Sequence, residues 1–112
     1  MTTSRDNLIP GTLNLLVLKA VSSGALHGYG ITKWILGRTE DVLRVEEGVL
    51  YPALHRLEKA GSLEAEWGRN DTGRRAKFYT LTPSGAERLR TEVERWRRTS
   101  RAVEVVITSE GA

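Results

Sequence analysis

The 112-residue chain contains no cysteine. This absence excludes disulfide frameworks, thiolate zinc sites and cysteine nucleophiles. Long apolar runs are missing as well: no stretch of about 18 apolar residues occurs, and residues 1–12 lack the apolar core of a secretion signal. We therefore expect a soluble, cytoplasmic protein that does not associate with membranes.

Histidine is scarce, and the usual motifs of enzyme chemistry are absent. His27 and His55 are the only histidines, and their spacing does not place them as metal ligands on one helix. The glycine-rich HGYG at residues 27–30 lacks the Lys and the Ser or Thr of a phosphate-binding loop, so it favours tight helix packing instead. We expect no enzymatic activity, no metal and no cofactor.

Size and charge limit the remaining classes. A chain of this length with 39% hydrophobic residues forms one domain with a small core, which association with a second copy would enlarge. The net charge is only +3, but basic residues gather in segments 69–77 and 88–101. Such clusters indicate either an anionic partner or a solvated surface.

Hydrophobic periodicity predicts helices, a hairpin and a long terminal helix. The expected elements are a helix between Gly11 and Gly24, helices over residues 28–38 and 46–61, strands over 42–45, 63–67 and 76–81, and a helix opened by Thr82 and Pro83. A helix-turn-helix followed by a hairpin is the winged-helix arrangement. The predicted class is therefore α+β, mainly α, with a winged helix-turn-helix over residues 1–82 and a C-terminal dimerisation helix over 83–112.

The third predicted helix carries a proline in its second turn. Leu50, Leu54 and Leu57 recur with helical spacing, whereas Pro52 removes one intrahelical hydrogen bond. Because the apolar spacing begins before the proline, we favour one continuous, bent helix. A helix that begins only at Tyr51 is the alternative.

The last helix carries an apolar seam whose members step by three and four residues. They are Ala86, Leu89, Val93, Trp96, Ser100, Val103 and Ile107. This spacing is a heptad pattern, and a seam at the end of the chain has little of its own domain left to cover. We place a homodimer interface on Leu89, Val93, Trp96, Ser100 and Val103. The arginines between them alternate with glutamates, which is typical of a solvated, ion-paired face.

Three stretches, LHGYGITKWI, LYPALHRLE and RRAKFYTLTPSG, occur in this order and spacing. Together they resemble the PadR family of bacterial transcriptional regulators, and most closely its short, acidobacterial-type members. The resemblance extends from Leu8 to about Val106. It implies a DNA-binding winged helix, a homodimer held by the C-terminal helix, and usually repression that a small molecule relieves.

In a helix-turn-helix the recognition helix presents its N-terminal residues to base edges in the major groove. The predicted DNA contacts are Lys33, Glu47, Gly48, Val49, Tyr51, His55 and Arg56 on the helices, and Arg74, Arg75 and Lys77 on the wing. The alternatives are a half-buried core position for Tyr51, a plain surface position for His55, and solvated positions for Lys33 and the wing residues. Glu47 and Val49 depart from the commonest family pattern, so the base specificity stays open.

The resemblance also implies an effector site. Drug-binding short members of the family carry a tryptophan at the position of Trp96, which faces its symmetry mate across an apolar pore. Residues at the positions of Asn14, Leu15 and Lys19 line that pore. A planar aromatic small molecule is the implied ligand, and plain packing of Trp96 in the interface is the alternative.

The expected partners are double-stranded DNA and a second copy of the chain. The alternative function is a winged-helix interaction module that has lost DNA binding and pairs with another protein. The basic wing favours DNA, whereas Glu46 and Glu47 leave room for the second function.

Overall fold

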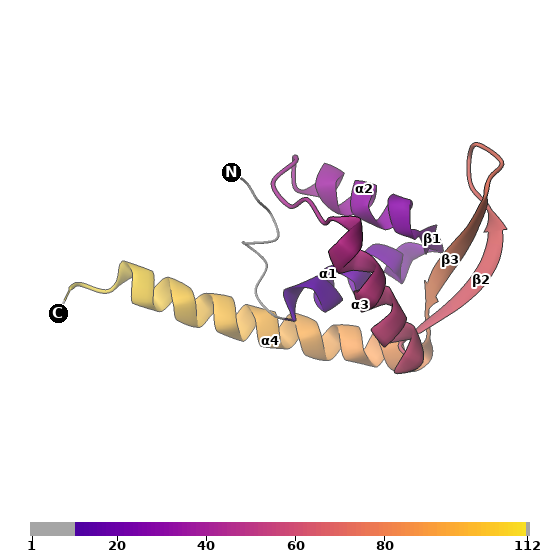
Figure 1. Ribbon diagram of the computed structural model, residues 1–112. Helices are drawn as coiled ribbons and strands as arrows, with labels where there is room; N and C mark the ends of the chain where they lie inside the picture. The colour runs from indigo at the N-terminus through magenta and orange to yellow at the C-terminus, as the bar shows by residue number, and fades with distance from the viewer. Residues whose placement is uncertain (1–10, 112) are drawn as a thin grey trace.

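The computed structural model describes residues 11–111, so the first ten residues of the predicted DNA-binding unit lie outside it. Its elements are α1 (Thr12–Ala20), a short 3-10 turn η2 (Val21–Ser23), β1 (Leu26–His27), α2 (Gly28–Arg38), α3 (Glu47–Lys59), β2 (Leu63–Arg69), β3 (Arg75–Leu81) and α4 (Pro83–Thr108). Helices α1 to α3 form the body, the hairpin stands at one side, and α4 runs along the base and beyond it (Figure 1). The predicted winged-helix fold, α+β and mainly α, is confirmed.

The sheet is antiparallel, with the strand order β1-β3-β2. Strand β1 is only two residues long and pairs Leu26 with Tyr79 and His27 with Phe78. The strand predicted over residues 42–45 is wrong, because that segment is an irregular loop. Val45 of this loop packs into the hydrophobic core, so the segment is held by the burial of this side chain and not by pairing with the sheet.

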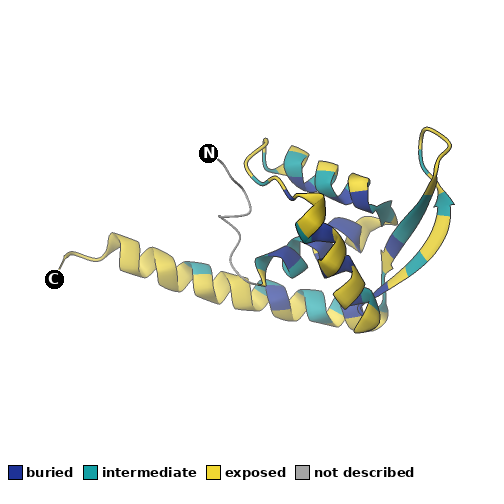
Figure 2. Cartoon of the chain, in the orientation of Figure 1, coloured by how far each residue is buried: buried dark blue, intermediate teal, exposed yellow. Residues whose placement is uncertain are grey.

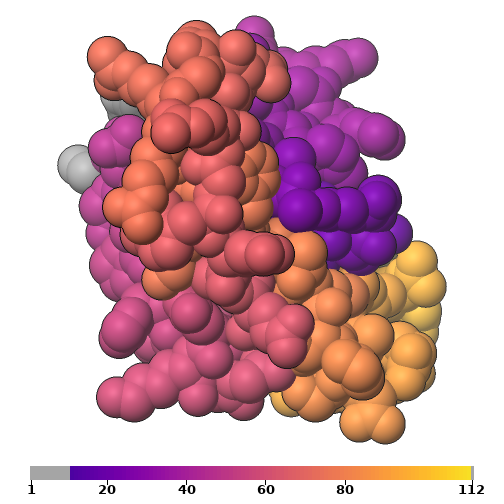
Figure 3. Space-filling view, turned by 90° about the vertical axis from the view of Figure 1, so that its right-hand side faces the viewer, coloured from indigo at the N-terminus to yellow at the C-terminus, as the bar shows by residue number. Residues whose placement is uncertain are grey.

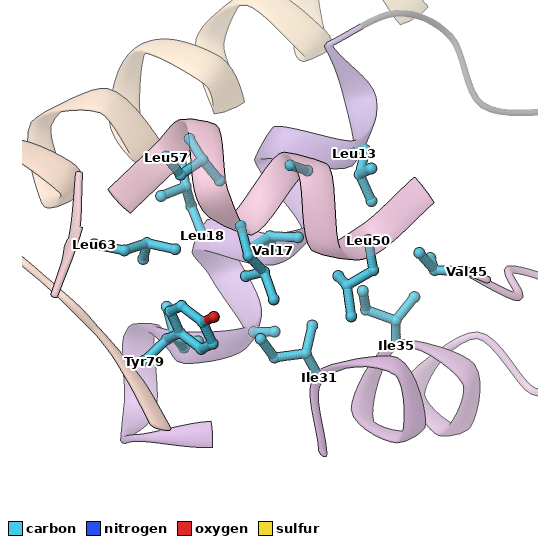
Figure 4. Packing of buried hydrophobic residues seen from close by; sticks show 14 residues of the cluster. Leu13, Val17, Leu18, Ile31, Ile35, Val45, Leu50, Leu57, Leu63 and Tyr79 are labelled. Carbon is cyan, nitrogen blue, oxygen red and sulfur yellow. The ribbon is translucent and has the colours of Figure 1, made fainter. Parts of the chain in front are cut away.

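The hydrophobic core lies between the three helices and the sheet (Figure 4). Leu50, Leu54 and Leu57 on α3 are fully buried, as their spacing predicts. They meet Val17 and Leu18 of α1, with Ile31 and Ile35 of α2 completing the cluster. Burial of each large side chain stabilises the fold by roughly 1.5–3 kcal/mol. This packing fixes α3 and leaves its opposite face in solvent.

Helix α3 runs through Pro52 without interruption. The amides of Val49 and Leu50 donate to the carbonyl of Glu46 at 3.0 and 2.9 Å, so the helix is already formed before the proline. The prediction of one continuous helix is confirmed, and the alternative start at Tyr51 is wrong. Pro52 itself is exposed, so its ring takes no volume from the core.

The start of α4 is anchored to the end of α3. The Thr82 hydroxyl accepts from the Gly85 amide at 2.9 Å and donates to the Gly61 carbonyl at 2.6 Å, and the Ser84 hydroxyl donates to the same carbonyl at 3.0 Å. Gly85 is buried against the carbonyl of Ser62, which a side chain at this position would strike. The predicted start of the helix at Thr82 and Pro83 is confirmed.

The two halves of α4 have different surroundings. The first half packs against α1, whereas residues 101–111 are exposed throughout and extend away from the body (Figure 2). Only the N-terminal half of α4 therefore packs against the rest of the domain.

Replacing Gly85 with Ala should destabilise the fold by about 1–3 kcal/mol, because the added methyl group meets a backbone carbonyl that has little room to move. Urea denaturation measures the change. Gly37→Ala is the matched control: no atom lies within 4 Å of a methyl group at this helical position. That substitution should be neutral or stabilise by up to about 1 kcal/mol. Equal effects of both changes would contradict the close packing at Gly85.

Candidate nucleic-acid interface

Helix α3 presents a polar face to solvent on the side opposite its leucines. Glu47, Gly48, His55 and Arg56 are exposed on it, and Glu47 lies in the first turn, where a carboxylate favours the positive end of the helix dipole. Val49 differs from the other predicted contacts because it is half-buried and packs against the core.

Tyr51 extends from α3 toward the start of α2. Its side chain is 45% exposed, and its ring and hydroxyl lie directly on Gly28, where any side chain would overlap them. The Gly30 amide in the same turn donates to Nδ1 of His27 at 3.0 Å, so His27 caps α2. Because Gly28 has no side chain, the Tyr51 ring packs against the start of α2, and part of the ring stays exposed to solvent.

A cleft of about 400 Å³ separates the start of α2 and α3 from the wing. Tyr29, Tyr51, Trp67, Arg75 and Lys77 are among its lining residues. Figure 3 looks onto the hairpin, and Figures 1 and 3 both place its tip at the same end of the molecule as α2. Aromatic and basic side chains from three elements thus surround one hollow.

The tip of the wing is ordered by the side chains of Asn70 and Arg69, since the Arg69 guanidinium donates to the Gly73 carbonyl at 2.9 Å. Oδ1 of Asn70 accepts from the amides of Thr72 and Arg74 at 3.1 and 2.9 Å, and Gly73 adopts a positive φ of 85°. Arg74 follows this turn and is exposed. The turn thus fixes the backbone of the first predicted wing cation, Arg74, at the base of the hairpin loop.

The other predicted cations have different environments. The Arg75 guanidinium lies 4.3 Å from the centre of the Trp67 ring, and the Lys33 ammonium lies 5.5 Å from that of Tyr29. Lys77 is half-buried and pairs with Glu58 of α3 at 3.1 Å. Lys77 therefore ties the wing to α3, whereas Arg75 and Lys33 stay near the surface on aromatic rings.

Tyr79 marks the inner limit of the cleft. Burial raises the pKa of its phenol above the ordinary value, an effect that the Lys77 ammonium opposes. The hydroxyl is therefore neutral at physiological pH.

A second hollow lies between α1 and α4. It measures about 740 Å³, and its lining includes Leu15, Lys19, Val93 and Trp96. Three of the four predicted effector residues thus meet there, whereas the half-buried Asn14 is not part of the lining. Nearby, the buried Glu92 carboxylate pairs with Arg88 and Arg95 at 3.4 and 3.5 Å.

Across residues 11–111, no group of three or more acidic or histidine side chains is placed to hold a metal ion. No helix in this part of the chain has the length and apolarity needed to cross a membrane.

Comparison with known families assigns this arrangement. The model of the transcriptional regulator PadR-like family matches residues 17–91, from α1 to the first turns of α4. The chain belongs to the PadR-like family. The resemblance seen in the sequence is thereby confirmed.

Individual PadR-like relatives agree with this assignment. A transcriptional regulator of Mycobacterium tuberculosis is 36% identical over 73 residues, which cover 65% of this chain and 64% of that protein. A transcriptional regulator from Clostridium thermocellum superposes with a TM-score of 0.78 at 30% identity, covering 88% of this chain and 95% of its own. A PadR-like transcriptional regulator from Bacillus cereus gives 0.76 at 25% identity, with coverage of 93% and 99%.

The PadR-like family consists of DNA-binding transcriptional regulators, so the chain is a regulator and not an enzyme. Two aromatic residues of the cleft, Tyr29 and Trp67, were missed as candidate site residues. One signal was present in the sequence: the alternation of LEAEWGR puts Trp67 and Arg69 on one face of the strand and both glutamates on the other.

Replacing Gly28 with Ala should displace the Tyr51 ring from its position against the start of α2 and weaken binding to duplex DNA. If Tyr51 donates to a phosphate, the loss should be about tenfold or more, the effect of one hydrogen bond to a charged group. Fluorescence anisotropy measures the affinity, and thermal melting checks the fold. Tyr51→Phe is the matched variant, and the double variant should lose no more than either single one. Full affinity of folded Gly28→Ala would contradict this role of the contact.

Proposed function

We propose that this PadR-like protein is a cytoplasmic, homodimeric repressor that binds double-stranded DNA through α3 and the wing and is released by a planar aromatic molecule. One observation carries the proposal: the apolar seam of α4 stands in solvent. Trp96, Val103 and Ile107 on this helix are 38%, 48% and 68% exposed.

The seam supports a dimer because of its position and length. Its inner part, Leu89 and Val93, is half-buried beside α1, and its outer part continues along a helix that leaves the body. A second copy supplies the same seam, so an antiparallel or crossed pair would cover both. Such a dimer also offers two recognition helices to successive major-groove faces, about 34 Å apart.

DNA binding through α3 and the wing has support from chemistry as well as from the family. The exposed Glu47 offers an acceptor for a cytosine amino group, and the N-terminal end of the α3 dipole favours a phosphate. Arg56 and Arg74 are exposed and suited to phosphates, as is Lys33 at the edge of the cleft. The basic and aromatic cleft favours DNA over the alternative of a protein-interaction module.

The effector part of the proposal rests on the hollow between α1 and α4. Leu15 and Trp96 offer apolar surface there, and Val93 belongs to the proposed dimer interface as well. A planar molecule stacked on Trp96 would therefore change the fit between the two subunits. Such a change alters the separation of the two winged units, which is how ligand binding would relieve repression.

Replacing Val93 with Glu should produce monomers, because each subunit then places a carboxylate in the apolar seam beside its symmetry mate. Sedimentation at micromolar concentration measures the state, and binding to a two-fold DNA site should be lost with the dimer. Val105→Glu is the control: Val105 is exposed on the same helix but lies off the seam, so this variant should stay dimeric. A monomeric wild-type protein would refute the proposed assembly.

Replacing Arg74 with Ala should weaken DNA binding and flatten its dependence on salt. Loss of one phosphate contact reduces the slope of log K against log salt concentration by about 0.9. Titrations at several salt concentrations measure the slope. Arg98→Ala removes an equal charge from the exposed face of α4 and should leave the slope unchanged. An unaltered slope for Arg74→Ala would exclude the wing tip from contact with phosphates.

A further inference from the structure

Trp67 is the large aromatic residue of the wing, and more than half of its side chain, 55%, is exposed. In the hairpin register Trp67 lies opposite Lys77, and Arg69 lies opposite Arg75. Residues directly opposite each other share one face of a sheet, so Trp67 and Arg75 are diagonal neighbours on the same face. Both line the cleft that faces Tyr51 of α3.

The guanidinium of Arg75 lies over the ring of Trp67. A distance of 4.3 Å from the guanidinium carbon to the ring centre is well inside the range of a cation–π interaction. In the part of the chain that the structure describes, the wing cation that pairs with a carboxylate is Lys77, through Glu58. Trp67 is therefore the group that orients Arg75, and it does so without neutralising the charge.

Stacking leaves the donors of the guanidinium available. Arginine stacks on aromatic rings through the flat face of its guanidinium, and in that geometry its N–H groups point outward in the plane. Those N–H groups form the fork that binds two oxygens of one phosphate. A stacked arginine is thus restrained in position while its whole hydrogen-bonding edge stays free.

We propose that Trp67 is a positioning residue for DNA binding: its indole ring holds the Arg75 guanidinium at the cleft, ready to bind a backbone phosphate. The proposal rests on the proposed contact between the wing and DNA. Its physical basis is that a long, flexible side chain loses less conformational freedom on binding when it is already restrained. Trp67 acts through Arg75, so its contribution should vanish when Arg75 is absent.

A double-mutant cycle tests this dependence. The variants are Trp67→Leu, Arg75→Ala and the combination of both, and the probe is a short, mixed-sequence DNA duplex at low salt, which requires no knowledge of an operator. Trp67→Leu keeps an apolar side chain but removes the π face. It should weaken binding about two- to fivefold, the size of an exposed cation–π interaction. In the Arg75→Ala background the same substitution should have no further effect.

Two more variants separate positioning from simple structural support. Trp67→Phe restores an aromatic face and should recover most of the affinity that Trp67→Leu loses. Arg38→Ala is the matched control, because Arg38 is also stacked on a tryptophan, Trp34, at 5.0 Å, but is not among the residues that line the cleft. It should weaken binding less than Arg75→Ala does.

A measurement without DNA keeps this proposal distinct from the proposed function. The ring current of Trp67 should shift the side-chain protons of Arg75 upfield in NMR spectra, and Trp67→Leu should abolish that shift. An absent shift in the wild-type protein overturns the stacking itself. If the shift is present but the wild-type protein binds no DNA, the proposed function is wrong. The role of Trp67 in DNA binding is then wrong as well, although the contact between Trp67 and Arg75 stands.

If the wild-type protein binds DNA, the double-mutant cycle decides whether Trp67 acts through Arg75. Equal losses from Trp67→Leu with and without Arg75 would overturn the proposal and indicate that the indole contacts DNA by itself. If Trp67→Phe loses as much affinity for DNA as Trp67→Leu does, the proposal is also overturned, since an aromatic face would then make no difference.

Discussion

The geometry of the molecule depends on the close approach of two backbones, at the point where α3 ends and α4 begins. Gly85 lies against the carbonyl of Ser62, and the hydroxyls of Thr82 and Ser84 both donate to the carbonyl of Gly61. Gly61 itself has a positive φ of 84°, which reverses the chain immediately after the recognition helix. Because backbone atoms and short side chains make this junction, the angle between α3 and α4 has little freedom. The proposed recognition helix, α3, and the helix that carries the apolar seam, α4, are therefore held in a fixed relative orientation.

The charged residues divide into those that hold the structure together and those that remain accessible. Lys77 of the wing forms an ion pair with Glu58 of α3. On α4, Glu92 forms ion pairs with both Arg88 and Arg95. Arg74 and Arg75 instead stay near the surface, positioned by the Asn70 turn and by the Trp67 ring. A net charge of only +3 thus understates how much positive charge the wing presents. Position in the fold, more than composition, decides which cations can meet an anionic partner.

Elements with strong periodicity were predictable from sequence, whereas those that depend on distant partners were not. Leu50, Leu54 and Leu57 have the spacing of a buried helical face. Such spacing arises because one face of the helix packs against the core, so it predicts burial directly. The two residues of β1 have no pattern of their own and pair only because β3 passes beside them. The ion pair of Lys77 with Glu58 joins residues 19 positions apart, and the stacking of Arg75 on Trp67 requires the hairpin register. Local signals therefore located the winged helix, but not the environment of each side chain.

The length of α4 has a mechanical consequence. Its 26 residues span about 39 Å at the rise of an α-helix, and its base is rigidly joined to the winged unit. In the proposed dimer, which joins the two copies of α4 along the seam, this helix would act as a lever arm between the interface and the winged unit. A small rotation at the interface would become a displacement of several ångströms at the far end. In the proposed dimer, a slight repacking around Trp96 would therefore produce a mismatch with the pitch of DNA, with no change inside the winged unit itself.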